Sequence, residues 1–358
     1  MVIERINSLY SKYESHLSSL FLIGGFVFDI LTLRRADTFW ENFWIVTHLS
    51  IVAVTILILN RGRASGLKVQ SKRDTWPLYL LQFSFGGLLS AFLILYFRSA
   101  ALSASWPFIV FLAVAFLLNE RLRNRYERLT YQVTFFFLAL LLFFIYFIPV
   151  VMGVLGPAIF VFSCATALVA SRLFLAILGR WNKDGIQATR RPLQISLISI
   201  FVVINVLYFT NIIPPIPLSL REGNIYHYVV KDGMGNYSVI AEEKSWLNYF
   251  KIREQVTSYP GESLYAYTAI FSPARFNTKV VHKWQYYDLE NGDWITFSKI
   301  TLNTSGGRDN GYRTYSMASV TPGIWRVEVL TPSGQVLGRI GFEVKYTQIP
   351  PKLVTEVH

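Results

Sequence analysis

The sequence predicts a bundle of about seven transmembrane helices followed by an all-β antiparallel sandwich. The 358-residue chain is 53% hydrophobic and only 16% charged, whereas an average soluble domain carries roughly 25% charged residues. Long apolar runs dominate the chain up to residue 212, and short alternating segments with glycine-rich turns follow. The change falls within Ile195–Pro217, where an uncharged apolar run ends in three prolines that cannot continue a helix.

The apolar segments have close to the 17–25 residues that a helix needs to cross a bilayer. Residues 1–16 precede them as a short amphipathic lead-in, and residues 17–212 are predicted to form the transmembrane domain. In chain order, the predicted spans are Leu17–Leu33, Phe43–Leu59, Leu78–Phe97, Ala104–Leu118, Leu129–Ile148, Pro157–Leu178 and Ile195–Ile212.

Lys and Arg are concentrated in alternate loops of this domain. Residues 1–212 hold 19 Lys and Arg against 9 Asp and Glu, and the basic clusters follow the second, fourth and sixth spans. The positive-inside rule therefore places these loops and the N-terminus in the cytoplasm and the C-terminal domain outside it. Arg34 and Arg35 would lie on the outer side, against this rule. Because the charges flank apolar spans, the net charge of +12 does not indicate nucleic acid binding.

The C-terminal part is predicted to consist of a proline-rich linker at residues 213–222, a sandwich at 223–348 and a tail at 349–358. Ile225–Lys231 and Tyr237–Ala241 flank a glycine-rich turn, which predicts a β-hairpin. Further short alternating segments at similar spacing favour an immunoglobulin-like sandwich. Residues 243–256 form either a short helix or an irregular cover. The single cysteine, Cys164, lies in an apolar span, so the sandwich has to fold without a disulfide.

Several segments of this part resemble a known family, the bacterial domain of unknown function 2914. They are HKW at His282–Trp284, YRTYS at Tyr312–Ser316, GIWRVEV at Gly323–Val329, SGQVLG at Ser333–Gly338 and FEV at Phe342–Val344. The segment Gly25–Asp37 looks like one found in members of the family that carry membrane helices. Members of the family often carry this domain after several membrane helices, so the resemblance implies a protein of the bacterial inner membrane. Together with the charge pattern of the loops, this predicts a periplasmic sandwich. The resemblance implies no activity.

Asp29 is the most informative residue within a predicted span. A carboxylate in hydrocarbon costs at least a few kcal/mol, so we expect Asp29 to face other helices and to contact a polar group. Arg34 and Arg35 are the expected partners, and Asp37 and His48 complete a membrane polar cluster. This cluster is interpreted as a structural ion pair or hydrogen bond, with a functional ion, proton or lipid site as the alternative.

The candidate binding residues of the sandwich combine aromatic rings with guanidinium groups. Strand alternation places Trp284 and Tyr286 on one face, as it does Arg313 and Tyr315. Exposed aromatic rings beside Arg can stack on sugars or bind anionic groups. The alternative, which we favour, puts the tryptophans in the core and lets an arginine brace the sandwich. The full candidate set is Trp284, Tyr286, Arg313, Tyr315, Trp325 and Arg326.

No catalytic residue, metal site or cofactor is predicted. The histidines, at positions 16, 48, 227, 282 and 358, show no zinc spacing, although His227 and His282 could meet on neighbouring strands. Nucleotide-binding and nucleophile motifs are absent from the sequence.

The predicted function is that of a non-enzymatic accessory protein anchored in the lipid bilayer. Its sandwich would bind a protein, glycan or lipid partner of the bacterial envelope, and the chain could be a subunit of a larger membrane complex. The alternative is an integral-membrane enzyme or transporter that acts on a lipid-linked substrate at the outer face of the inner membrane.

Overall fold

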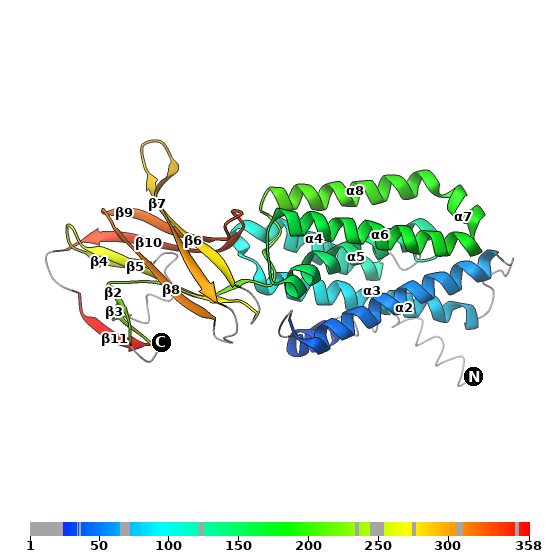
Figure 1. Cartoon of the computed structure of the whole chain (residues 1–358), viewed down its shortest axis with the longest axis horizontal. Coiled ribbons are helices and arrows are strands. Elements are labelled where there is room, and N and C mark those ends of the chain that lie inside the picture. Colours follow the sequence, from blue (N-terminus) through cyan, green and yellow to red (C-terminus); the bar gives the residue numbers. More distant parts are fainter. Residues whose placement is uncertain are drawn as a thin grey trace, which may run out of the picture. The chain divides into compact units, whose positions relative to one another are not determined.

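The computed structural model describes residues 24–33, 35, 37–64, 72–121, 125–232, 236–243, 254–273, 277–305, 311–347 and 351–358. The chain divides into two compact units (Figure 1). The first comprises Met1–Arg98, Pro107–Met152 and Pro157–Thr210, and the second comprises Ser99–Trp106, Gly153–Gly156 and Asn211–His358.

The helices of the first unit confirm the predicted membrane-type bundle. They are α2 (Phe39–Ala64), α3 (Lys72–Ser99), α4 (Leu102–Arg121), α5 (Leu129–Met152), α6 (Pro157–Trp181), α7 (Lys183–Ala188) and α8 (Arg190–Phe209). Among the described residues, all of these except the short α7 are long and apolar enough to cross a membrane. Residues 24–32 are also helical. The earlier part of the predicted span Leu17–Leu33, and the lead-in at 1–16, lie outside the described residues.

Helix α5 is the most hydrophobic of these helices, with a mean hydropathy of 2.8, and it packs against α2, α6 and α8. Helix α8 presents its apolar side chains outwards instead. Ile195 and Ile198 are 66% and 62% exposed, which water would disfavour but lipid tails accept. The helical region is therefore that of a multi-pass membrane protein.

The second unit contains three sheets rather than the two of a simple sandwich. The first has the order β1-β5-β8, the second β4-β10-β9-β6-β7 and the third β11-β3-β2. The strands are β1 (Ser219–Tyr226), β2 (Tyr228–Lys231), β3 (Tyr237–Glu242), β4 (Glu254–Ser258), β5 (Ser263–Phe271), β6 (Asn277–Asp288), β7 (Asp293–Ser305), β8 (Tyr312–Ser319), β9 (Gly323–Leu330), β10 (Val336–Tyr346) and β11 (Leu353–Val357).

Most strand pairs are antiparallel, as the sequence predicts, but β4 pairs with β10 in parallel. The predicted hairpin forms between β2 and β3. Its first strand is shorter than expected because the chain leaves β1 at Tyr226 and passes through His227 before β2 begins. Residues 349–358, predicted to be a tail, contain strand β11, which pairs with β3. Strands β6 and β7 project beyond the other strands as a long hairpin (Figure 1).

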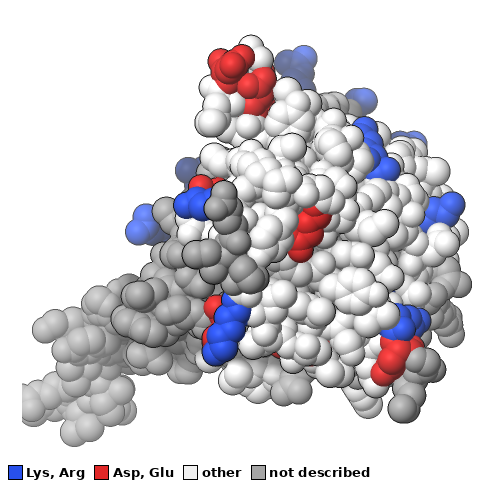
Figure 2. Space-filling view, turned by 90° about the vertical axis from the view of Figure 1, so that its left-hand side faces the viewer, with Lys and Arg blue, Asp and Glu red and all other residues white. Residues whose placement is uncertain are grey.

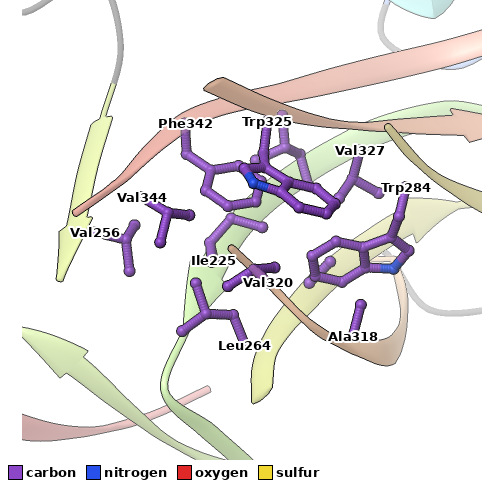
Figure 3. Packing of buried hydrophobic residues seen from close by; sticks show 12 residues of the cluster. Ile225, Val256, Leu264, Trp284, Ala318, Val320, Trp325, Val327, Phe342 and Val344 are labelled. Atoms are coloured by element: carbon purple, nitrogen blue, oxygen red, sulfur yellow. The ribbon is translucent and has the colours of Figure 1, made fainter. Parts of the chain in front are cut away.

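The main core lies between the five-stranded sheet and the β1-β5-β8 sheet (Figure 3). Trp284, Trp325 and Phe342 enter it from β6, β9 and β10, and all three are at most 2% exposed. The rings of Trp284 and Phe342 meet edge to face, with centroids 6.2 Å apart. Strand alternation turns every second residue of these strands inwards and the intervening residues outwards.

The β11-β3-β2 sheet packs against the outward face of the β1-β5-β8 sheet through tyrosines. Tyr226 and Tyr267 come from β1 and β5, and Tyr237 comes from β3. The ring of the C-terminal residue, His358, lies 5.4 Å from the ring of Tyr267. The β unit therefore has three layers, and its C-terminus closes the smaller of the two interfaces.

Candidate functional site

Two residues of the predicted binding set are structural. Trp284 is fully buried, and its indole Nε1 donates a hydrogen bond to Ser316 Oγ at 3.0 Å. Trp325 is 2% exposed, and its Nε1 donates to the backbone oxygen of Thr321 at 2.8 Å. Neither ring can contact a ligand on the surface, so their placement corresponds to the core interpretation.

The outward face of the five-stranded sheet carries a row of charged side chains across adjacent strands. Glu328 on β9 lies in register with Lys283 on β6 and with Arg339 on β10. Its carboxylate accepts hydrogen bonds from Lys283 Nζ at 3.2 Å and from Arg339 Nε at 2.8 Å. One nearly buried carboxylate therefore holds two cationic side chains in fixed positions.

Arg326, a member of the predicted set, lies on the same face two residues before Glu328. Its Nε donates to Gln285 Oε1 at 2.9 Å, and its Nη2 lies 3.6 Å from Glu328 Oε1. The guanidinium carbon is 4.0 Å from the ring centroid of Trp294, a cation–π contact. Trp294 reaches this position from β7, where it lies in register with Tyr287 of β6.

Burial and the neighbouring charges shift the pKa values of two of these groups. Burial raises the pKa of the Glu328 carboxyl, but Arg326, Arg339 and Lys283 more than offset this effect and leave its pKa below the usual value. The pKa of Arg326 is also lowered, first by burial and then by the like charge of Arg339, although Glu328 acts in the opposite direction. A second anion at this position would be attracted by the surplus of cations.

We call the outward residues of β6, β7, β9 and β10 the cationic face. Strand register and alternation assign to it the cations Lys279, Lys283, Lys299, Arg326, Arg339 and Lys345, and the anions Glu328 and Glu343. Residues 213–358 as a whole hold 15 Lys and Arg against 13 Asp and Glu, so this one face accounts for more than their entire net charge. At the end of the β unit seen in Figure 2 most of the surface is uncharged, with acidic residues gathered at its upper edge and basic residues scattered around its rim.

The remaining residues of the predicted set lie apart from this face. Tyr286 is partly buried and packs against the ring of Trp325 with centroids 5.6 Å apart. Tyr315 on β8 lies beside Tyr265 and Tyr237. The backbone oxygen of Arg313 accepts a hydrogen bond from Tyr237 Oη at 3.0 Å. The structure therefore separates the predicted set into core, tyrosine layer and cationic face.

Sequence reasoning found Arg326 but missed the residues that surround it. Lys283, Gln285 and Glu328 are polar residues at alternate positions of two strands, and that alternation was the available signal. Trp294 comes directly after the turn between β6 and β7. Its position opposite Arg326 depends on the pairing of three strands, which the local sequence does not specify.

In the helical unit, Asp29 contacts Ser90 of α3. Ser90 Oγ donates a hydrogen bond to Asp29 Oδ2 at 2.5 Å. Arg35, one of the expected partners, forms an ion pair with Asp37 at 2.7 Å. His48 is buried, and its Nδ1 lies 3.0 Å from the backbone oxygen of Trp44. Arg34, the other expected partner, lies outside the described residues.

A chain of buried amide side chains links several helices of the same unit, and sequence reasoning did not single it out. Asn60 Nδ2 on α2 donates to Gln132 Oε1 on α5 at 2.8 Å. Gln132 Nε2 donates to the backbone oxygen of Tyr126 at 2.6 Å, and Tyr126 Oη donates to Asn119 Oδ1 at the end of α4. Each of these groups has a partner, as polar groups in an apolar environment require.

His227 and His282, which could have met on neighbouring strands, belong to separate networks. His282 is fully buried, with ring nitrogens 2.8 Å from Ser316 Oγ and 3.0 Å from Thr268 Oγ1. Burial lowers its pKa to about 4, so the ring is neutral near pH 7. His227 lies instead between two carboxylates, with Nδ1 2.9 Å from Glu262 Oε1 and Nε2 3.2 Å from Glu242 Oε1. Within the described part of the chain, no cluster of His, Cys, Asp or Glu is suited to hold a metal ion.

All charged residues of the cationic face except Lys345 lie within the segment that one family model covers. Residues 277–344 match the model described as Protein of unknown function (DUF2914). This confirms the resemblance found in the sequence, for this segment of the chain. The match runs from β6 to β10 and includes Lys283, Arg326 and Glu328.

Similarities to solved structures are weak. An immunoglobulin-like protein from Pseudomonas aeruginosa has 11% identity and a TM-score of 0.22, with coverage of 36% of this chain and 97% of that one. A β-glucosidase from Listeria innocua in complex with isofagomine has 16% identity and a TM-score of 0.20, with coverage of 32% of this chain and 17% of that one. A DNA-bound alkylpurine DNA glycosylase from Pseudomonas fluorescens has 10% identity, a TM-score of 0.22, and coverage of 87% and 100%. No curated protein matches the chain.

Proposed function

We propose that the chain is a membrane-anchored accessory protein of the bacterial envelope. In this proposal the helices fix it in the inner membrane, the N-terminus is cytoplasmic, and the β unit lies in the periplasm and binds a partner there. The observation that carries the proposal is the cationic face, which is an organised set of polar side chains on a β unit that follows the membrane helices.

The positions of basic residues at the helix ends support the orientation. Arg61, Arg121 and Arg180 lie near the C-terminal ends of α2, α4 and α6. Because successive spans run in opposite directions, these three ends share one side of the membrane, and α8 ends on the other side. The positive-inside rule makes the basic side cytoplasmic.

Reporter fusions test the orientation. A reporter enzyme that is active only outside the cytoplasm should work when fused after His358 and should fail when inserted in the loop that follows Arg61. The opposite pattern would overturn the proposed location.

A second test addresses binding by the β unit. An envelope component should co-purify with the full chain and should be lost when the chain ends at Thr210. Recovery of the same component with both chains would contradict a binding role for the β unit.

A further inference from the structure

The cationic face contains a like-charge pair that a purely structural sheet would avoid. Lys283 of β6 and Lys299 of β7 lie directly opposite each other in the antiparallel register. Like charges at directly opposed positions destabilise a sheet. Lys283 has Glu328 as its counterion, whereas Lys299 is exposed and has no ion pair with any residue that the structure describes. An external anion that binds at these two lysines explains their arrangement better than a contribution to the stability of the sheet does.

Arg326 adds a third cation beside this pair, in a geometry that suits a ligand. Gln285, Glu328 and Trp294 hold its guanidinium from three directions, so little rotational freedom is left to lose on binding. Next to Arg326 in the register is Gly341 of β10. No atom lies within 4 Å of the position that a Cβ would take at Gly341, so the surface there is open.

The cations are distributed over the face rather than gathered at one point. Lys299, Lys283 and Arg339 lie on three different strands in one row, and neighbouring strands are about 4.8 Å apart. Lys279 lies four residues before Lys283 on the same side of β6, about 13 Å along the strand. A single small anion could reach only one or two of these groups, whereas an extended polyanion could contact several.

The exposed side chains of this face also limit the class of polyanion. Among the described residues, none of the strongly exposed large hydrophobic side chains belongs to the outward positions of β6, β9 or β10. On β7, Ile295 and Phe297 are exposed, but they lie on the other side of the hairpin, where Ile295 is opposite Tyr286 and Phe297 contacts Trp325. Insertion into a membrane surface, or the apolar centre of a protein interface, would need such groups. The aromatic rings here are Trp294 and Tyr287, which are partly buried with centroids 5.2 Å apart. Aromatic rings beside cationic groups suit a carbohydrate that carries carboxylates.

From this arrangement we infer that the cationic face binds an acidic polysaccharide, with Lys283, Lys299 and Arg326 on its carboxylates and the Trp294–Tyr287 pair against a sugar ring. The inference rests on the proposed function, because it names the partner of the same β unit. It commits to a glycan rather than to a lipid surface or an acidic protein segment.

Binding of the detergent-solubilised full chain to immobilised polygalacturonate tests the inference, with uncharged dextran as the comparison. The wild-type chain should bind polygalacturonate and not dextran, and affinity should fall as salt is raised. The double change Lys299→Gln with Arg326→Gln should weaken binding about tenfold or more, because charge-assisted contacts are lost. Absence of binding to polygalacturonate, or equal binding to dextran, would overturn the inference.

Two controls exclude general attraction to a basic protein. Lys352→Gln removes an exposed cation from outside the face, and Arg125→Gln removes one from a basic loop of the helical unit. Both variants should bind like the wild type, and a loss as large as that of the double variant would defeat the assignment to this face. Melting temperatures of all variants show whether the fold is retained.

The sugar contact has its own test. Trp294→Ala should weaken binding to polygalacturonate more than binding to poly-glutamate, and Trp294→Phe should restore part of the difference because it keeps an aromatic ring. If poly-glutamate binds as tightly as polygalacturonate and Trp294→Ala has no selective effect, an acidic protein segment replaces the glycan and the inference fails. Failure here with a successful periplasmic reporter would leave the proposed function standing, because the fusions do not depend on the ligand.

Discussion

Ser90 of α3 donates a hydrogen bond to the carboxylate of Asp29 at 2.5 Å, and this contact joins a residue of the first predicted span to the helical bundle. Ser90 is 2% exposed, so water cannot easily replace it as a donor. The acidic side chain of Asp29 is therefore hydrogen-bonded to a neutral side chain on another helix. This geometry agrees with the expectation that Asp29 faces other helices.

We predict that Ser90→Ala lowers the thermal stability of the detergent-solubilised chain. The change leaves a partly buried carboxylate oxygen without this donor, which costs about 1–3 kcal/mol. Ser50→Ala is a suitable control, because Ser50 is exposed on α2 and bonds only to the preceding turn of its own helix. An unchanged melting temperature for Ser90→Ala would show that the hydrogen bond is not structural.

Asp29→Asn separates the structural role from a functional one, because it keeps the shape and one acceptor but removes the charge. If Asp29 serves structure, the melting temperature should fall while partner binding is retained. If it forms part of an ion, proton or lipid site, binding should fall while stability holds or rises. Melting curves and the co-purification assay, measured on the same preparations, distinguish these outcomes.

The two buried tryptophans should dominate the stability of the β unit. Replacement of Trp284 or Trp325 by Ala leaves a large cavity in the main core and should cost about 3–5 kcal/mol of unfolding free energy. Denaturant unfolding of a 213–358 fragment, followed by its β-type circular dichroism signal, measures this loss. Leu289→Ala is the control, since Leu289 is 77% exposed in the β6–β7 turn. An unfolding free energy that is unchanged in Trp325→Ala would show that this ring lies on the surface and not in the core.

The membrane spans could be predicted from the sequence because they depend on a local quantity, the length of an apolar run. Pro157 begins both the sixth predicted span and α6, and Leu129 begins both the fifth span and α5. The ends of the helices differ more from the prediction, because polar residues such as Arg121 continue a helix beyond its apolar part.

The arrangement of the sheets was less accessible from the sequence. The parallel pairing of β4 with β10 joins segments that lie far apart in the chain, and no turn motif in the sequence predicts it. Alternation likewise divides β6 into two faces without saying which face is inward, so the burial of Trp284 stayed open. The Lys283–Glu328–Arg339 row depends on the register of three strands, which only the folded structure supplies.

Strand β11 leads to a prediction about the C-terminus. Its residues pair with β3, and His358 and Tyr237 exchange two backbone hydrogen bonds of 2.8 and 3.0 Å. Removal of residues 351–358 should expose the edge of β3 and the tyrosines beneath it, so the β unit should melt at a lower temperature and be cleaved faster by protease. Lys352→Gln in the intact chain is the control. Unchanged melting and cleavage would show that β11 adds no stability.

The final prediction concerns the stability of the β unit as a function of pH. Burial lowers the pKa of His227, but the hydrogen bonds and charges of Glu242 and Glu262 outweigh it, so the pKa is raised above 6.5. Protonated His227 donates to both carboxylates and joins the start of β2 to the segments that carry Glu242 and Glu262.

A group whose pKa is higher in the folded state than in the unfolded state stabilises the fold while it is protonated. The stability from His227 should therefore be fully present below about pH 6.5 and should be lost as pH rises through the raised pKa of the folded protein.

Glu242 behaves in the opposite sense, because its lowered pKa makes its contribution disappear as pH falls below 4.5 towards that lower value. Between pH 5.5 and 8.5 the melting temperature of the 213–358 fragment also reflects His282, whose lowered pKa of about 4 takes stability away as pH falls below about 6.5. The difference between the wild type and His227→Gln therefore measures the His227 effect. His227→Gln should flatten the decline with rising pH, whereas Glu343→Gln, a change at an exposed ion pair, should leave it intact. An equal decline in the wild type and in His227→Gln would assign the pH dependence to other groups.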